Sequence, residues 1–189
     1  MLTAIQEFHK SLIITGFRTA GIKNTADFLK AVNANKESTV EVQFLDAKLV
    51  ATWEHLYFAA LDALTAFKNR ENISKTLAME TMLYASAQRQ ITKATEQAGI
   101  KPTSKKIALL IIGNTEREVK SALVAIQARV HAQVDDGVLE LSEEKAKAIK
   151  KAFGISDLEL ETVRKNGEEE ETALVSLVIE RMALLATQH

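Results

Sequence analysis

The order of apolar and polar positions along the chain changes between strand-like and helix-like stretches. Residues 11–18 and 107–112 are short, apolar and bounded by glycine or polar residues, which is typical of strands. Val40, Val42 and Phe44 alternate with polar residues, the period of a strand with one face buried. Because residues 107–112 are apolar without interruption, they predict a strand that is covered on both faces.

Helical periodicity dominates much of the remaining chain. Thr115 and Glu118, and again Ser156 and Glu159, have the spacing of a capping box, in which two side chains satisfy the free backbone groups at a helix start. Ser142 precedes a third amphipathic stretch that ends near Gly154. Besides the helices that begin at these three caps, the spacing predicts helices over residues 24–33, 52–67, 74–98 and 172–187.

Two further stretches have weaker patterns. Leu2, Ile5 and Phe8 have helical spacing and predict a short amphipathic helical turn within residues 1–9. Residues 134–141 predict a strand that the sequence Asp135-Asp136-Gly137 interrupts with a bulge or turn. Strands interspersed with long helices predict an α/β or α+β fold, in one domain spanning residues 1–189, with residues 1–10 set aside as an N-terminal extension. Periodicity alone leaves the strand order open.

Composition narrows the classes of function. The chain has 189 residues, a formal net charge of −1 and no cysteine. A protein that binds nucleic acid non-specifically is usually far more basic, so any RNA contact must be local. The lack of cysteine excludes disulfides and thiolate chemistry and is compatible with a reducing cytoplasm. No apolar run is long enough to cross a membrane, and the N-terminus does not have the pattern of a signal peptide.

The segment of residues 74–98 combines an apolar stripe with polar groups. Glu80 and Gln90 fall within that stripe, so each is expected to make hydrogen bonds inside the protein. Arg89 and Lys93 are four residues apart and share another face, beside small and apolar residues. This second face is either an ordinary solvated helix surface or a site for the phosphate of a nucleic acid strand end.

The sequence contains no convincing catalytic or metal-binding set. The four histidines are far apart, and no phosphate-binding glycine loop is present. Asp135 and Asp136 are adjacent, so on a strand they point to opposite faces, and a turn with solvated carboxylates is expected. His55 opens a helix, where a neutral, hydrogen-bonded role is expected. We therefore predict a binding protein with no catalytic residue, cofactor or metal.

One heptapeptide within the central segment resembles a family signature. The signature is Ala-Ser-Gly-Gln-Arg-Gln-Ile, from the Cgi-type or TPRKB-like regulatory subunits of the KEOPS complex, and the matching residues here are Ala85-Ser86-Ala87-Gln88-Arg89-Gln90-Ile91. Residues 46–51, His55, the turn and strand at 135–139 and the closing apolar helix follow in the family's order, so that the resemblance covers residues 11–186. Two positions differ from the family pattern. Ala87 replaces a glycine, which is expected to cost little because alanine favours helix, and Tyr84 replaces a commonly basic residue.

The resemblance implies a fold and two binding sites. The fold is a small, mainly antiparallel sheet of about four strands flanked by helices. The implied ligand of the central segment is the single-stranded CCA end of tRNA, with the candidate contacts Met82, Tyr84, Ala85, Ser86, Gln88, Arg89 and Lys93. The implied partner of the C-terminal helix, residues 172–187, is the small atypical kinase/ATPase subunit of KEOPS, with the candidate contacts Leu174, Leu177, Val178, Arg181, Met182 and Leu185.

The apolar arc of the last helix leaves two interpretations open. Val175, Ile179, Leu184 and Ala186 are apolar in addition to the six candidate contacts, so the arc is wider than one core-facing stripe. The helix is either a buried terminal helix or one that packs with one face and offers the other to a partner.

The resulting prediction is a cytoplasmic, non-catalytic KEOPS subunit that holds the tRNA acceptor end and contacts the kinase, in support of threonylcarbamoyladenosine modification of tRNA. The alternative is a regulator of the kinase that does not bind RNA, which the near-neutral charge and Tyr84 favour. A stand-alone enzyme is disfavoured because a catalytic set is missing.

Overall fold

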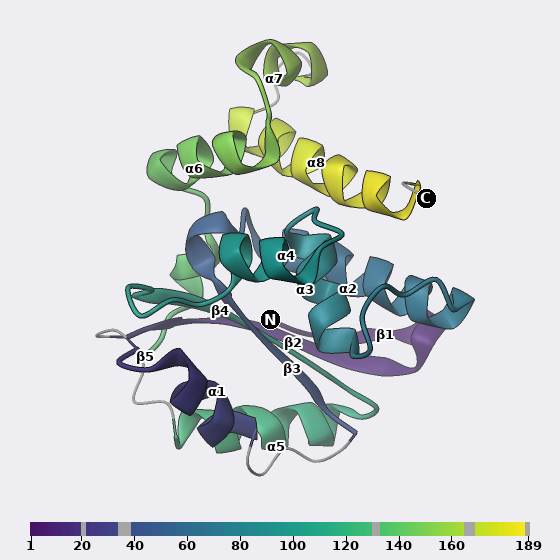
Figure 1. Ribbon diagram of the computed structural model, residues 1–189, viewed down its shortest axis with the longest axis vertical. Coiled ribbons are helices and arrows are strands. Elements are labelled where there is room, and N and C mark those ends of the chain that lie inside the picture. Colours follow the sequence, from purple (N-terminus) through teal and green to yellow (C-terminus); the bar gives the residue numbers. More distant parts are fainter. Residues whose placement is uncertain (20–21, 34–38, 130–132, 165–168, 188–189) are drawn as a thin grey trace. The chain divides into compact units, whose positions relative to one another are not determined.

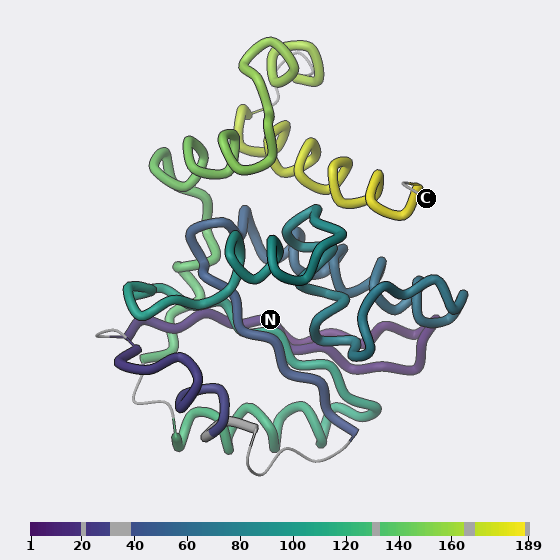
Figure 2. Tube along the Cα trace, in the orientation of Figure 1, coloured from purple at the N-terminus to yellow at the C-terminus, as the bar shows by residue number. Residues whose placement is uncertain are grey.

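The computed structural model describes residues 1–19, 22–33, 39–129, 133–164 and 169–187, without the side chains of residues 31–33. Its internal contacts divide the chain into two compact units (Figures 1 and 2). The first, which we call the sheet unit, comprises Met1–Ala47 and Ile100–Val138. The second, the helical unit, comprises Lys48–Gly99 and Leu139–His189. Both units are discontinuous in sequence, so neither is a single segment of the chain. The prediction of one domain remains a prediction.

The sheet unit is built on an antiparallel sheet with the strand order β1-β2-β4-β3, in which β5 adds a short pairing to the end of β2. This confirms the expected small antiparallel sheet. Its elements are β1 (Leu2–Ile5), the 3₁₀ turn η1 (Gln6–Phe8), β2 (Lys10–Arg18), α1 (Thr25–Asn33), β3 (Glu41–Asp46), β4 (Lys106–Gly113), α5 (Glu116–Gln127), β5 (Gln133–Val134) and the 3₁₀ turn η3 (Asp136–Leu139), which runs into the helical unit.

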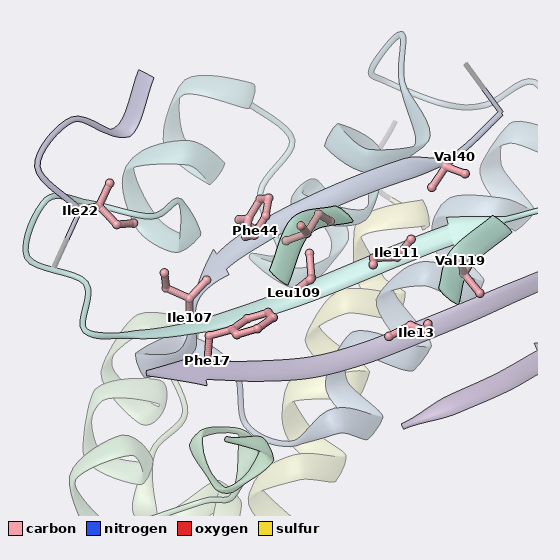
Figure 3. Close-up of a cluster of buried hydrophobic side chains, with 10 residues drawn as sticks. Ile13, Phe17, Ile22, Val40, Phe44, Ile107, Leu109, Ile111 and Val119 are labelled. Carbon is pink, nitrogen blue, oxygen red and sulfur yellow. The ribbon is translucent and has the colours of Figure 1, made fainter. Parts of the chain in front are cut away.

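The core of the sheet unit lies between the sheet and the two helices α1 and α5, which cover one of its faces (Figure 1). Phe17 of β2, Phe44 of β3 and Leu109 of β4 meet there, and α5 adds Val119 (Figure 3). The side chains of β4 that point to the opposite face are buried as well, and every residue of 107–112 is at most 1% exposed. The expected strand with two covered faces is therefore confirmed.

The N-terminal residues form a strand at Leu2–Ile5, and the predicted helical turn within residues 1–9 is reduced to the 3₁₀ turn η1. β1 pairs with β2 so that Leu2 lies opposite Ile13 and Ile5 opposite Lys10, and His9 turns the chain with a positive φ of 50°. A helix of nine residues is too short to be stable on its own. Pairing with a nine-residue strand satisfies the same backbone groups at once.

The predicted strand over residues 134–141 is largely wrong, because only Gln133–Val134 pairs as a strand. The turn expected at Asp135-Asp136-Gly137 is present, and it continues as the 3₁₀ turn η3. The carboxylate of Asp136 accepts hydrogen bonds from the Thr15 hydroxyl at 2.6 Å and from the Gly16 amide at 2.9 Å. These two contacts replace strand pairing beside β2 and end the ladder.

The helical unit contains no strand among its described residues. The 3₁₀ turn η2 (Ala47–Leu49) leads into it, and its helices are α2 (Trp53–Asn69), α3 (Leu77–Ala85), α4 (Ile91–Ala98), α6 (Glu143–Phe153), α7 (Asp157–Val163) and α8 (Glu170–Ala183), followed by the 3₁₀ turn η4 (Leu184–Thr187). The predicted caps are present: Ser142 caps α6, Ser156 and Glu159 form a capping box on α7, and Gly154 ends α6 with a φ of 63°. The capping box predicted at Thr115 is found on α5.

Helix α8 packs against α2, α3, α6 and α7 and is the centre of the helical unit. Its buried side chains Leu174, Leu177 and Val178 join Ile149 and Phe153 of α6 in one apolar cluster. The inner face of the last helix is thus core in this structure.

Candidate functional site

The signature heptapeptide forms a turn between two helices, and the predicted continuous helix over residues 74–98 is wrong. α3 ends at Ala85, α4 begins at Ile91, and residues 86–90 connect them. The start also differs from the predicted residue 74, because α3 begins at Leu77 and the Thr76 hydroxyl caps it by accepting from the Met79 amide.

Backbone geometry explains why the helix stops here. The Gln88 amide donates to the Leu83 carbonyl at 3.0 Å, and the Ala87 amide donates to the Tyr84 carbonyl at 2.8 Å. This pair of bonds is the Schellman motif, which ends a helix with one residue in the left-handed conformation. That residue is Ala87, with a φ of 49°. The expectation that alanine costs little here was therefore wrong, since the position is the one where a helix end favours glycine.

His55 connects the start of α2 to the end of α3. Its Nδ1 accepts from the Ala51 amide at 3.1 Å, so the proton is on Nε2, which donates to the Ala85 carbonyl at 2.9 Å. The ring is fully buried and packs edge-on against Phe153. Burial above all lowers the pKa of His55 to about 4; Lys145 adds to this effect, and the bond to Ala85 opposes it. The expected neutral, hydrogen-bonded role is confirmed.

Two further polar side chains hold the backbone around α3 and its turn. Glu80 is fully buried and accepts from the Ile73 and Ser74 amides at 3.1 and 2.6 Å, as expected for a polar group on a buried face. Gln97 of α4 donates to the Ser86 carbonyl and accepts from the Gln88 amide group, both at 3.2 Å. Sequence reasoning missed Gln97, because its role depends on α4 folding back beside the turn.

The candidate tRNA contacts differ in their exposure. Met82, Tyr84, Ala85 and Ser86 are buried, and Gln88 is half-buried. Only Arg89 and Lys93 are exposed. Gln90, expected on the buried stripe, is exposed as well, because the break at Ala87 shifts the register of every following residue. The turn and the start of α4 therefore present two cations on the surface, together with Ile91, which is 45% exposed, while Met82 and Tyr84 point to the interior.

The start of α4 has the features of an anion site. No side chain caps this helix, and no acidic residue lies in its first turn. Uncapped amides and the helix dipole favour a negative group at such a position. Arg89 Nη1 donates to the Leu185 carbonyl at 3.2 Å, which orients the guanidinium and leaves its other donors for a ligand.

Most of the candidate kinase contacts on the last helix are buried. Leu174, Leu177, Val178, Met182 and Leu185 are at most 2% exposed, and Arg181 pairs with Glu159 of α7. The apolar residues beside this buried face are more accessible. Val175 and Ile179 are half-buried, and Leu184 at the start of η4 is 42% exposed.

Within the described residues, no group of His, Asp and Glu has the arrangement to hold a metal ion. Asp135 and Asp136 have structural roles: Asp135 pairs with Arg18, whose guanidinium holds the pKa of that carboxyl below its usual range, and Asp136 binds β2. In the described part of the chain, no helix is both long enough and apolar enough to span a bilayer.

Comparison with known proteins identifies the family. Residues 19–186 match the family described as kinase binding protein CGI-121. The chain is also 31% identical, over 144 residues, to the regulatory protein Cgi121 of Methanocaldococcus jannaschii, in an alignment that covers 76% of this chain and 85% of the relative. The chain therefore belongs to the CGI-121 family.

Proposed function

We propose that this protein is a non-catalytic, kinase-binding regulatory subunit of a KEOPS-type complex and that it also binds the 3′ CCA end of tRNA. The kinase part of the proposal is supported by membership of a family that is described as kinase-binding, and by the regulatory name of its archaeal relative. Its partner is then the complex's small atypical kinase/ATPase subunit. A chain without cysteine suits the reducing cytoplasm in which we place this complex.

The observation that carries the RNA part is the α3–α4 turn, where the signature heptapeptide presents Arg89 and Lys93 at the uncapped start of α4. A phosphate there would receive backbone amides from α4 and a paired contact from the guanidinium. Gln88, a half-buried amide side chain of the turn, is the residue that we assign to a base edge. The buried Met82 and Tyr84 support this surface from beneath, so we assign them to the packing of the turn.

Such a subunit contributes affinity and position, not bond making. A tRNA whose acceptor end is held at one subunit is oriented for chemistry at another, and this orientation alone can lower a reaction barrier. Contact with the kinase-like ATPase would connect the same subunit to the regulation of the complex.

The second candidate function is a kinase regulator that does not bind RNA. The net charge of −1 favours it, as does the burial of four of the seven candidate tRNA contacts. The two proposals agree on the kinase and differ only in what the turn binds.

The test is the affinity of the isolated protein for whole tRNA and for the same tRNA without its CCA end, each at two salt concentrations. We expect binding that depends on the CCA end. Arg89→Ala should weaken this binding by about 10-fold. It should also reduce the slope of the logarithm of the binding constant against the logarithm of the salt concentration by about one. Arg117→Ala is the matched control, because Arg117 is an exposed arginine on α5 of the sheet unit.

Equal weakening by Arg89→Ala and Arg117→Ala would mean diffuse electrostatic binding and would contradict a site at the turn. If neither tRNA binds while the kinase does, the second candidate function is correct. If neither tRNA nor kinase binds, the proposed function fails as a whole.

A further inference from the structure

Helix α2 has an exposed aromatic face that its packing in the helical unit does not use. Trp53 is 40% exposed and Phe58 37% exposed, while Tyr57 and Leu61 are half-buried. Trp53, Tyr57 and Leu61 follow one another at intervals of four residues, so they form one row along the helix. The opposite face, which includes His55, Ala59 and Ala63, is buried.

The aromatic rings of this face are ordered by contact with one another. Trp53 and Tyr57 meet edge to face with ring centroids 6.3 Å apart, and Tyr57 and Phe58 do the same at 5.5 Å. Rings that are already packed lose little conformational freedom when a partner covers them. Exposed tryptophan and tyrosine of this kind often provide much of the binding energy at protein interfaces.

Asp62 lies one helical turn beyond Phe58, at the border of the aromatic face. Its carboxylate is half-buried and has no hydrogen bond or ion pair to any described residue. Burial raises its pKa to about 6, because a half-buried carboxylate is poorly solvated. A cation placed beside it would offset this cost of desolvation.

The charges along α2 determine which kind of partner fits. Glu54 and Asp62 flank the aromatic face, and α2 has no lysine or arginine before Lys68. Aromatic surfaces that stack nucleic acid bases are combined with positive charge, and this surface has the opposite sign. The face therefore suits an apolar protein surface that contains a basic side chain.

We propose that Trp53, Tyr57, Phe58, Leu61 and Asp62 form a protein-docking surface, which we call the α2 face, and that its occupant is the kinase, through apolar side chains and one lysine or arginine directed at Asp62. This assignment rests on the proposed function, since it names the surface through which kinase binding occurs. It moves the interface from the inner residues of α8, which are core, to a helix that packs against α8.

The experiment measures the affinity of the full chain for the kinase subunit of the same organism by isothermal titration calorimetry. We expect Trp53→Ala and Phe58→Ala each to weaken binding by about 10- to 30-fold, the range of interface hot spots. Asp62→Lys should weaken binding further, because the new lysine would repel the basic side chain of the kinase. Asp62→Asn should have a smaller effect, because it removes the attraction without adding a repulsion.

The matched control is Val124→Ala on α5, which removes an apolar side chain that is 65% exposed in the sheet unit, and which should change the affinity by less than about twofold. Thermal melting of each variant checks that the fold is intact. Asp62→Asn should melt no lower than the wild type, because it removes a charge that lacks a partner.

Each outcome has one interpretation. If the wild type does not bind the kinase, the proposed function fails, whatever the α2 face does. If the wild type binds and the α2 variants bind equally well, the assignment of the interface to the α2 face is wrong. A loss of affinity seen only with Ile179→Ala or Leu184→Ala would then assign the interface to the accessible side of the last helix. Concentration-dependent dimerisation that Phe58→Ala abolishes, with kinase affinity unchanged, would assign the face to a second copy of this chain and overturn the proposal.

Discussion

The sheet unit and the helical unit solve the problem of buried polar groups in different ways. In the sheet unit, the buried polar side chains are the hydroxyls of Ser11, Thr15 and Ser104. Among the described residues, all buried acidic and basic side chains lie in the helical unit: His55, Glu80 and Lys145.

The difference follows from how each unit satisfies its backbone. Strand pairing satisfies the amides and carbonyls of β2 and β4 directly, so most of their side chains can be apolar. Helices leave free groups at every end and connection. His55, Glu80 and Lys145 each bind a backbone group at such a place, with the Lys145 ammonium donating to the Glu140 carbonyl at 2.8 Å. These three buried side chains of the described residues therefore hold helix ends and turns in place.

The largest expected effect compares the two cores. Leu109→Ala in β4 and Leu177→Ala in α8 each leave a cavity at a buried site, so each should lower the free energy of unfolding by about 2–5 kcal/mol. Urea unfolding followed by circular dichroism and by the fluorescence of Trp53, the single tryptophan, measures this. If Leu177→Ala left stability unchanged and weakened kinase binding, the inner face of α8 would be the partner surface after all.

The second prediction uses the buried histidine of the helical unit. The folded-state pKa of His55, about 4, lies below the value of 6.5 for an unfolded chain, so the unfolded state binds more protons between these two pH values. Stability should be full above pH 6.5 and should fall by up to about 3 kcal/mol as the pH drops towards 4. His55→Gln should lose stability at pH 7 and show a flatter decline, as measured by urea unfolding at several pH values.

Phe153→Leu is the control for this prediction, because it removes the ring beside His55 and keeps both hydrogen bonds. It should lower stability by a similar amount at pH 7 and pH 4.5. A pH dependence in His55→Gln as steep as that of the wild type would show that other groups cause the acid sensitivity.

The smallest expected effect tests the turn itself. Ala87→Gly relieves the left-handed conformation at the end of α3 and should raise the free energy of unfolding by about 0.5–1 kcal/mol. Ala94→Gly within α4 is the matched variant and should lower it by about 1 kcal/mol, the usual cost of glycine inside a helix. Thermal melting measures the sign of both stability changes. If Ala87→Gly lowered the stability, Ala87 would be helical and not left-handed.

Local signals in the sequence predicted much of the fold. The strands β2 and β4, and the caps at Thr115, Ser142 and Ser156, were predictable because each depends on residues that are close together in the chain. The heptapeptide pointed to the family for the same reason. Its seven residues are contiguous.

What failed depended on contacts between distant residues. β1 exists because β2 offers it a partner, and the strand predicted at residues 134–141 ends where Asp136 reaches Gly16. At the candidate site, a periodic stripe placed Gln90 inside and Arg89 outside on one continuous helix, and the left-handed Ala87 changed that register. Periodicity also could not show which side of α8 is core, because both sides are apolar.

The sequence by itself determined the class of fold, most helix starts and the family, since these are encoded in short patterns of residue type. Only the tertiary structure decided which polar groups hold turns, which cations are exposed at the α3–α4 turn and which face of α2 is left uncovered. The physical reason is that burial belongs to an assembled set of elements. A side chain is inside or outside only once its neighbours from elsewhere in the chain are in place.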